Sequence, residues 1–96
     1  MATVKVMYWK DIPYAVRAEG DGGRASKQLP KQFEAAVDAA AMAEGLTEMD
    51  EYQAAFRWSD EEERPGTAEE AAQAMYDEIV HTYTPVWLAR LARREA

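Results

Sequence analysis

The sequence contains no cysteine and only one histidine among its 96 residues. A chain without cysteine forms no disulfide scaffold, binds no zinc or iron–sulfur centre through thiolates, and has no thiol nucleophile. No apolar run approaches the roughly 20 residues of a membrane-spanning helix, and the first residues lack the length and composition of a signal peptide. We therefore expect a soluble, cytoplasmic protein without a metal, a cofactor or a membrane partner.

Hydrophobic residues make up 48% of the chain and aromatic residues 10%, which favours a folded globule over a disordered segment. The length predicts a single domain over residues 1–96. The net charge of −7 is uneven, with +3 in residues 1–31, −12 in residues 32–78 and +2 in residues 79–96. An acidic majority opposes non-specific binding of nucleic acid, so no nucleic-acid partner is expected. An ordinary solvated surface also explains the excess acid.

Two strands are predicted near the N-terminus. Over residues 3–12, Val4, Val6 and Tyr8 alternate with Lys5, Met7 and Trp9, and large apolar groups on both faces predict a central strand. A second, short alternating run covers residues 14–19. Pro13 should mark a bend or bulge between them, because proline lacks an amide donor. The short connection predicts an antiparallel pair. The glycines of residues 20–23 then indicate a turn.

Two helices are predicted from apolar residues at helical spacing. The first covers residues 29–44, and Gly45 is placed to end it in a left-handed conformation. The second begins at Thr67, which can form a capping box with Glu70. The pair Thr84-Pro85 either interrupts this second helix or begins a further one.

Between the helices the pattern is less decisive. Residues 46–51 are predicted to connect, and residues 59–66 to form an acidic loop. Residues 52–58 favour a third strand, although Tyr52 and Phe56 are four apart and also suit one or two helical turns. The order ββαβα predicts an α+β domain. We expect a small antiparallel or mixed sheet of about three strands, covered on one face by two helices, with an extra C-terminal helix if Pro85 begins one.

The glycine-rich segment is the nearest approach to an anion-binding loop. Backbone amides of Gly22 and Gly23, the side chains of Arg24 and Lys27, and the start of the following helix could together hold a phosphate or carboxylate. The spacing matches neither the Walker nor the dinucleotide-binding pattern. A flexible turn leaving a hairpin is the plainer interpretation.

The single histidine offers the only side chain with an unperturbed pKa near neutrality. His81 follows Asp77 by four residues, so a helix would place both on one face as a base and its orienting carboxylate. A surface contact of this spacing explains the pair equally well. We therefore expect no enzyme activity from it.

Aromatic residues are numerous for so short a chain, and two helices shield only one face of a small sheet. An uncovered aromatic surface is typical of protein interaction sites. Lys10 and Arg17 should orient the acidic rim of a partner. We expect the contacts themselves to come from Tyr8, Trp9, Tyr14 and Trp58.

The motif from Met7 to Pro13, the helix from Phe33 to Met42 with Gly45-Leu46, and the segment from Asp50 to Arg57 resemble the small bacterial domain labelled "virulence factor". That domain opens with tyrosine–tryptophan–arginine–aspartate–isoleucine–proline; here Lys10 replaces the arginine. The resemblance covers roughly residues 4–75 and supplies no catalytic residues. It implies likeness to the C-terminal part of conserved virulence factor C, which accompanies a scaffold-type domain named for iron–sulfur assembly. It also implies likeness to proteins encoded beside methylenetetrahydrofolate-reductase-like and corrinoid methyl-transfer enzymes.

Two functions therefore compete. The first is a non-catalytic accessory or scaffold subunit whose aromatic sheet face docks on a partner protein, either a larger cytoplasmic enzyme or assembly or a second copy of itself. By the resemblance, such an enzyme would belong to one-carbon metabolism. The second is a small module or enzyme that binds a folate or another anion at residues 20–27.

Overall fold

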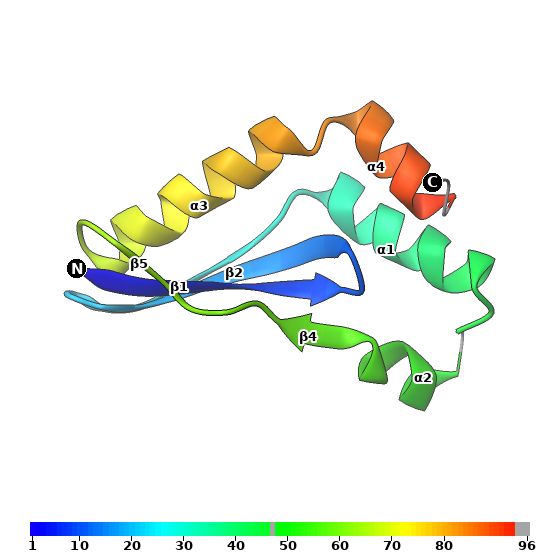
Figure 1. Ribbon diagram of the computed structural model, residues 1–96, viewed down its shortest axis with the longest axis horizontal. Helices are drawn as coiled ribbons and strands as arrows, with labels where there is room; N and C mark the ends of the chain where they lie inside the picture. Colours follow the sequence, from blue (N-terminus) through cyan, green and yellow to red (C-terminus); the bar gives the residue numbers. More distant parts are fainter. Residues whose placement is uncertain (47, 94–96) are drawn as a thin grey trace.

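The computed structural model describes residues 1–46 and 48–93 and has an α+β architecture (Figure 1). The described residues form five strands and four helices, where about three strands were expected. The elements are β1 (Ala2–Trp9), β2 (Ile12–Gly20), β3 (Gly23–Gln28), α1 (Lys31–Ala43), α2 (Met49–Ala54), β4 (Phe56–Trp58), β5 (Glu62–Arg64), α3 (Ala68–Thr82) and α4 (Pro85–Ala92).

All strand pairs are antiparallel, in the order β3-β2-β1-β4, and β5 also pairs with β1. The predicted pairing of the first two strands is confirmed. A bulge interrupts it between Met7 and Tyr8, where Met7 pairs with Ala15 but Tyr8 pairs with Pro13. The extra residue, Tyr14, lies beside the predicted proline irregularity.

Three segments differ from expectation. β3 lies where only a turn and loop were expected, and it pairs with β2 along its whole length. The strand expected over residues 52–58 is correct only for β4, because Tyr52 belongs to α2, the helical turn kept as the alternative. The expected acidic loop contains β5, whose backbone pairs with the first residues of β1.

The helix termini follow the local sequence. Thr67 and Glu70 form the predicted capping box, and Gly45 has a φ of 74° beyond the end of α1. Thr84 caps α4 by accepting a hydrogen bond from the amide of Trp87, and Pro85 occupies the first turn. The Thr84-Pro85 pair therefore separates two helices. No helix within the described ranges is long and apolar enough to span a membrane.

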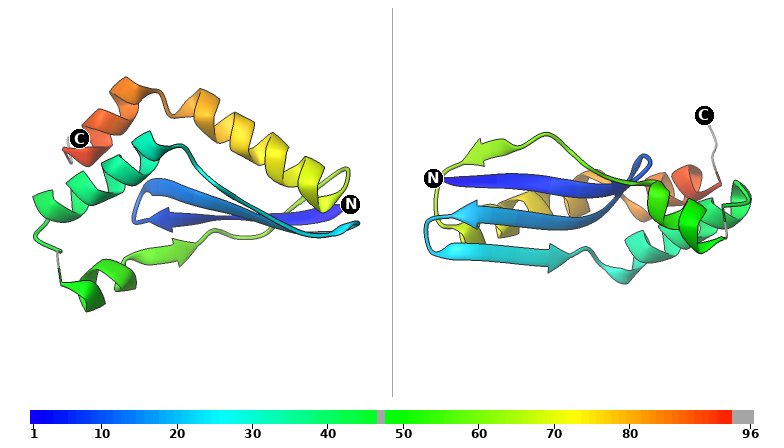
Figure 2. Two further views of the ribbon diagram at one scale, coloured as in Figure 1. Left: turned by 180° about the vertical axis from the view of Figure 1, so that it is seen from behind. Right: turned by 90° about the horizontal axis from the view of Figure 1, so that it is seen from below.

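The helices cover one face of the sheet. The small side chains of α3 lie on that face, over β1, β2 and β3, while α4 packs chiefly on α1 beyond the hairpin end of the sheet (Figures 1 and 2). The opposite face is visible in front of α3 in the right-hand view of Figure 2, where only α2 lies near one end of it. The buried strand residues beneath α3 are Val4, Val6, Val16, Ala18 and Ala25.

Candidate interaction face

The uncovered face of the sheet, here called the open face, carries three cross-strand rows of side chains. Directly opposed residues of neighbouring strands share a face. Lys5 pairs with Arg17, which in turn pairs with Ser26. The second row crosses four strands. A third row joins Thr3 to Glu19 and Glu63, and Glu19 to Arg24. The open face therefore comprises Lys5, Arg17 and Ser26 in one row, Trp58, Met7, Ala15 and Gln28 in the second, and Glu63, Thr3, Glu19 and Arg24 in the third.

Trp58 projects from β4, at one border of the sheet, and its ring contacts two cations of the open face. The Lys5 ammonium lies 4.6 Å from the centroid of the Trp58 ring, and the Arg17 guanidinium carbon lies 4.9 Å from it. Cations at this distance are attracted to the negative face of an aromatic ring. In the described part of the chain neither Lys5 nor Arg17 forms an ion pair with a carboxylate. The ring remains 36% exposed, so its surface is available to a partner.

A hollow of about 320 Å³ adjoins Trp58. Its lining combines aromatic rings, aliphatic groups, hydroxyl and amide groups, and cations. Such a combination gives an apolar contact area with polar groups placed to orient what binds there. The lining residues are Met7, Tyr14, Ala15, Val16, Arg17, Ser26, Lys27, Gln28 and Trp58.

An aromatic cluster closes the end of the open face nearest α2. Tyr14 and Tyr52 both meet the Phe56 ring edge-on, at centroid distances of 5.1 and 5.5 Å. The Tyr52 hydroxyl donates a hydrogen bond to a carboxylate oxygen of Asp38 at 3.2 Å. Burial, followed by the charge of Asp38, raises the pKa of Tyr52 to about 12. Tyr52 therefore stays neutral and anchors α2 to α1.

Trp9 was expected to contact a partner from an exposed position, but it is buried in the core. Its side chain is 0% exposed, and its indole Nε1 donates a hydrogen bond to the Tyr52 carbonyl oxygen at 2.9 Å. The extra residue of the bulge lies in β2, and the regular pairing of β1 with β4 keeps Trp9 on the same side of β1 as Met7. Trp9 is buried because α2 covers this end of the sheet, with the Tyr52 ring 6.0 Å from the Trp9 ring. Trp9 cannot contact a partner of this folded form.

Tyr8 and Lys10 also lie away from the open face. Tyr8 is half-buried beneath the Arg57 guanidinium, which lies 4.9 Å from its ring. Tyr8 neighbours Tyr83, and the pKa of the Tyr83 hydroxyl is raised above its ordinary value, first by burial and then by Tyr8. Lys10 occupies the β1–β2 turn, and its Nζ lies 2.7 Å from a Glu44 carboxylate oxygen. Of the six residues expected to contact a partner, the structure gathers Tyr14, Arg17 and Trp58.

The residues expected to cradle an anion do not converge. Gly22 and Gly23 lie at the β2–β3 turn, whereas α1 begins beyond the other end of β3, about 20 Å away for a strand of this length. Arg24 lies 3.7 Å from a Glu19 carboxylate, and the Lys27 ammonium lies 2.7 Å from one of Glu69. Each cation therefore already has a carboxylate partner within the fold, although the pair of Arg24 with Glu19 is long and highly exposed.

The histidine pair shows no catalytic geometry. His81 is exposed in the last turn of α3, and the carboxylate of Asp77 accepts a hydrogen bond from the Gln73 amide at 2.9 Å. Among the residues that the structure describes, no cluster of three or more histidine, aspartate or glutamate side chains could hold a metal ion.

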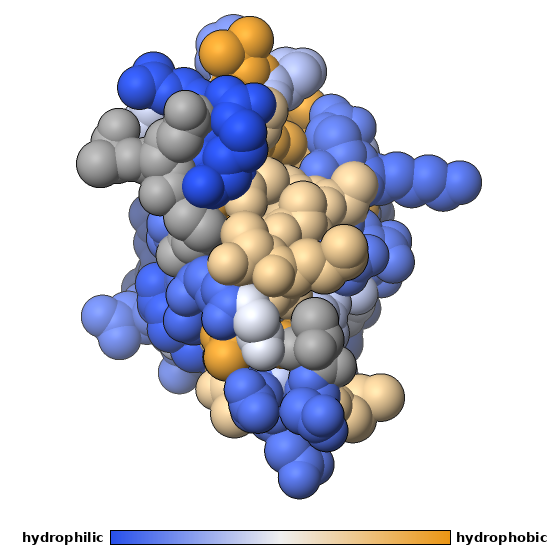
Figure 3. Space-filling view, turned by 90° about the vertical axis from the view of Figure 1, so that its right-hand side faces the viewer, coloured by the Kyte–Doolittle hydropathy of each residue, from blue (hydrophilic) through white to orange (hydrophobic). Residues whose placement is uncertain are grey.

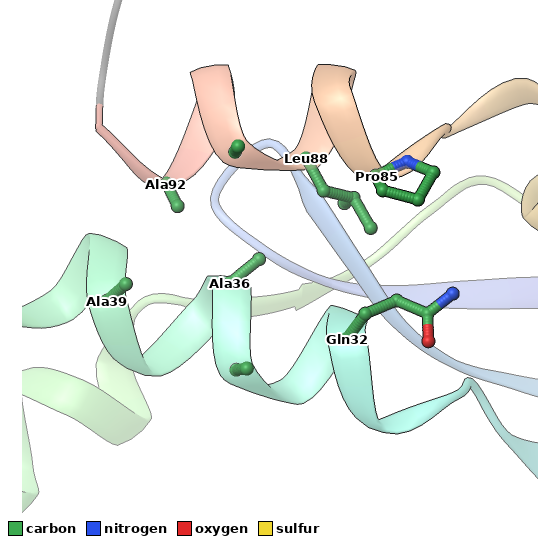
Figure 4. Close-up of a pocket in the computed structure, with 8 residues that line it drawn as sticks. Gln32, Ala36, Ala39, Pro85, Leu88 and Ala92 are labelled. Carbon is green, nitrogen blue, oxygen red and sulfur yellow. The ribbon is translucent and has the colours of Figure 1, made fainter.

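A second surface feature lies between α1 and α4. It is a groove of about 260 Å³, bordered by α1 on one side and α4 on the other (Figure 4). Figure 3 views the end of the molecule where these helices terminate and shows a mildly apolar patch surrounded by hydrophilic side chains. Only Gln32 brings a polar side chain to the groove, so its chemistry specifies no ligand. The lining is Gln32, Ala35, Ala36, Ala39, Pro85, Leu88, Ala89 and Ala92.

Sequence reasoning missed part of the open face. Lys5 and Met7 occupy alternate positions of the first strand, so the period of two already placed them together on the face away from Val4 and Val6. Ser26 and Gln28 gave no such signal, because β3 was not expected to be a strand. Their place on the face follows only from the pairing of β3 with β2.

The fold and this face define a small α+β domain with one helix-covered and one aromatic, cationic sheet surface. The model of the "Virulence factor" family matches residues 7–92, and this chain belongs to that family. The match begins at residue 7 instead of 4, and at its other end it extends beyond residue 75 to include all of α3 and α4. No curated protein and no solved structure matches the chain.

Proposed function

We propose that this protein is a non-catalytic accessory subunit that docks through its open face on a larger protein with an acidic rim. The observation that carries the proposal is Trp58, half-exposed between Lys5 and Arg17 beside the hollow. Tryptophan and arginine are the residues most often found at the energetic centres of protein interfaces. Two cations without acidic partners would attract carboxylates of the bound protein.

The family resemblance supports a choice of partner. It favours a larger cytoplasmic enzyme or assembly connected with folate- or corrinoid-dependent methyl transfer. The alternative, an anion- or folate-binding module at residues 20–27, has less support because Arg24 and Lys27 are paired with carboxylates.

The test compares tryptophan variants of matched exposure. The tagged protein is used to isolate partners from its native cells, and the captured proteins are quantified by mass spectrometry. Trp58→Ala removes the exposed aromatic ring of the open face, and Arg17→Glu reverses the charge of one of the two cations beside that ring. Trp87→Ala is the control, because Trp87 is 46% exposed and has the Arg90 guanidinium 5.7 Å from its ring, but lies on α4.

We expect one partner to bind the wild type and the Trp87→Ala variant, and to lose about 30-fold in affinity with Trp58→Ala, the effect of removing an interface hot spot of ~2 kcal/mol. Arg17→Glu should weaken the same partner. Circular dichroism of each variant separates lost binding from lost folding. Equal capture by the wild type and Trp58→Ala would refute the proposal. Saturable anion binding that Arg24→Ala abolishes would favour the alternative.

A further inference from the structure

The outer edge of β3 borders the open face and has no neighbouring strand. β3 pairs only with β2 in the described part of the chain. The right-hand view of Figure 2 shows β3 along one border of the sheet, with no segment beside it. Except for Ala25 and the half-buried Lys27, the residues of β3 are exposed. This border therefore resembles the strand edges at which extended peptides join a sheet.

The register of the hairpin shows which backbone groups face outward. In an antiparallel pair, opposed residues alternate between exchanging two hydrogen bonds and exchanging none. Gly20 and Gly23 close the two-residue turn, so their pair exchanges bonds. Counting from Gly23, the amides and carbonyls of Arg24, Ser26 and Gln28 point away from β2. These backbone groups are placed to pair with an added strand.

We infer that the docked segment is an acidic, extended peptide of the partner, which adds to β3 as a further strand. Strands lie about 4.8 Å apart, so a carboxylate on the added strand opposite Arg24 would lie beside the Arg24 side chain, which is 83% exposed. Arg24 lies on the open face, two positions before Ser26. The cations beside this edge thus select negative side chains on the added strand.

The same charges disfavour a second copy of this chain. β3 carries two cations, Arg24 and Lys27, and no carboxylate, so pairing it with β3 of another copy would add like charges to the same edge. An accumulation of like charge destabilises a strand pair. An acidic strand gains from these cations, so the acidic peptide is the occupant that fits the edge.

Substitutions of Ser26 isolate the contribution of the backbone. Ser26→Pro removes an outward amide without removing a hydrogen bond to β2, and proline is tolerated on edge strands in this orientation. Ser26→Ala keeps the amide and is the matched control. Circular dichroism should show the same fold for both variants, because neither substitution touches a buried side chain.

The experiment titrates the isotope-labelled protein with a short capped peptide of alternating glutamate and valine, followed by nuclear magnetic resonance. A peptide with lysine in place of each glutamate tests charge, and one methylated at alternate backbone nitrogens tests strand pairing. We expect the glutamate peptide to shift the amide signals of Arg24, Ser26 and Gln28. It should bind at least about tenfold more tightly than the lysine peptide. The Ser26→Pro variant should no longer bind the glutamate peptide, whereas Ser26→Ala should still bind it.

Three results would overturn the inference: no binding of the glutamate peptide at millimolar concentration, equal binding of the lysine peptide, or unchanged binding by Ser26→Pro. Concentration-dependent dimers that Ser26→Pro abolishes would assign the edge to a second copy and also overturn it. The inference rests on the proposed docking function, yet the two fail separately. If the cellular partner is lost with Trp58→Ala but retained by Ser26→Pro, docking stands and strand addition fails.

Discussion

Replacing each of two tryptophans by phenylalanine should separate a residue that holds the fold from one that serves the surface. Trp9→Phe removes the hydrogen bond from the indole to the Tyr52 carbonyl, worth ~1 kcal/mol. It also leaves a gap of roughly 40 Å³ in a fully buried site, which costs ~1 kcal/mol. We expect a loss of about 2 kcal/mol, or roughly 8–16 °C in melting temperature for a domain of this size.

Trp58→Phe provides the matched comparison. It preserves an aromatic ring for Lys5 and Arg17 and changes a side chain that already meets solvent. Surface substitutions of this kind change stability by about 0.5 kcal/mol or less. Urea unfolding followed by far-ultraviolet circular dichroism measures both variants. If Trp9→Phe is no less stable than Trp58→Phe, the assignment of Trp9 to the core is wrong.

Two further predictions concern a tyrosine and a turn. Burial and Asp38 raise the pKa of Tyr52 from 10 to about 12, so the folded state favours the protonated hydroxyl. The contribution of this hydroxyl to the stability of the fold is therefore present below pH 10 and is lost as the pH rises to about 12. An absorbance titration of tyrosinate should show a late component to which Tyr52 and Tyr83 both contribute, because the pKa of Tyr83 is also raised. Tyr52→Phe should reduce the amplitude of this component by one tyrosine, and an unchanged amplitude would contradict the assignment. In thermal unfolding, Gly20→Ala should destabilise the protein by about 3 kcal/mol and Gly23→Ala by only about 1 kcal/mol. Both glycines have positive φ, but only at Gly20 would the new Cβ lie 2.7 Å from the Met1 carbonyl oxygen. Equal losses of stability in the two variants would contradict this close approach.

The elements that the sequence predicted are those whose own side chains form a periodic apolar pattern. The two N-terminal strands and the helices beginning near Lys31 and Thr67 bury regular stripes of their own residues. β3 was missed because only Ala25 is buried in it, and its stability comes from backbone pairing with β2. β5 was missed for a similar reason, since its charged residues pair with β1 through the backbone.

The candidate site was partly predictable for a related reason. Alternation along a strand predicts the side on which a residue lies, but not what covers that side. Trp9 lies on the same side of β1 as Met7, as the pattern predicts, yet it is buried because Tyr52 of α2 covers that end of the sheet. The convergence of Trp58 with Arg17 depends on the pairing of β4 with β1, and no local pattern in the sequence contains that contact.

The central position of β1 has a consequence for how the chain is synthesised. One edge of β1 can pair with β2 almost as soon as both have left the ribosome. Its other edge must wait for β4 and β5, which lie about fifty residues or more further along the chain. Contacts of such long sequence separation form slowly. The nascent chain therefore carries an apolar strand with one unsatisfied side during most of translation, and this strand is where a chaperone would be expected to bind first.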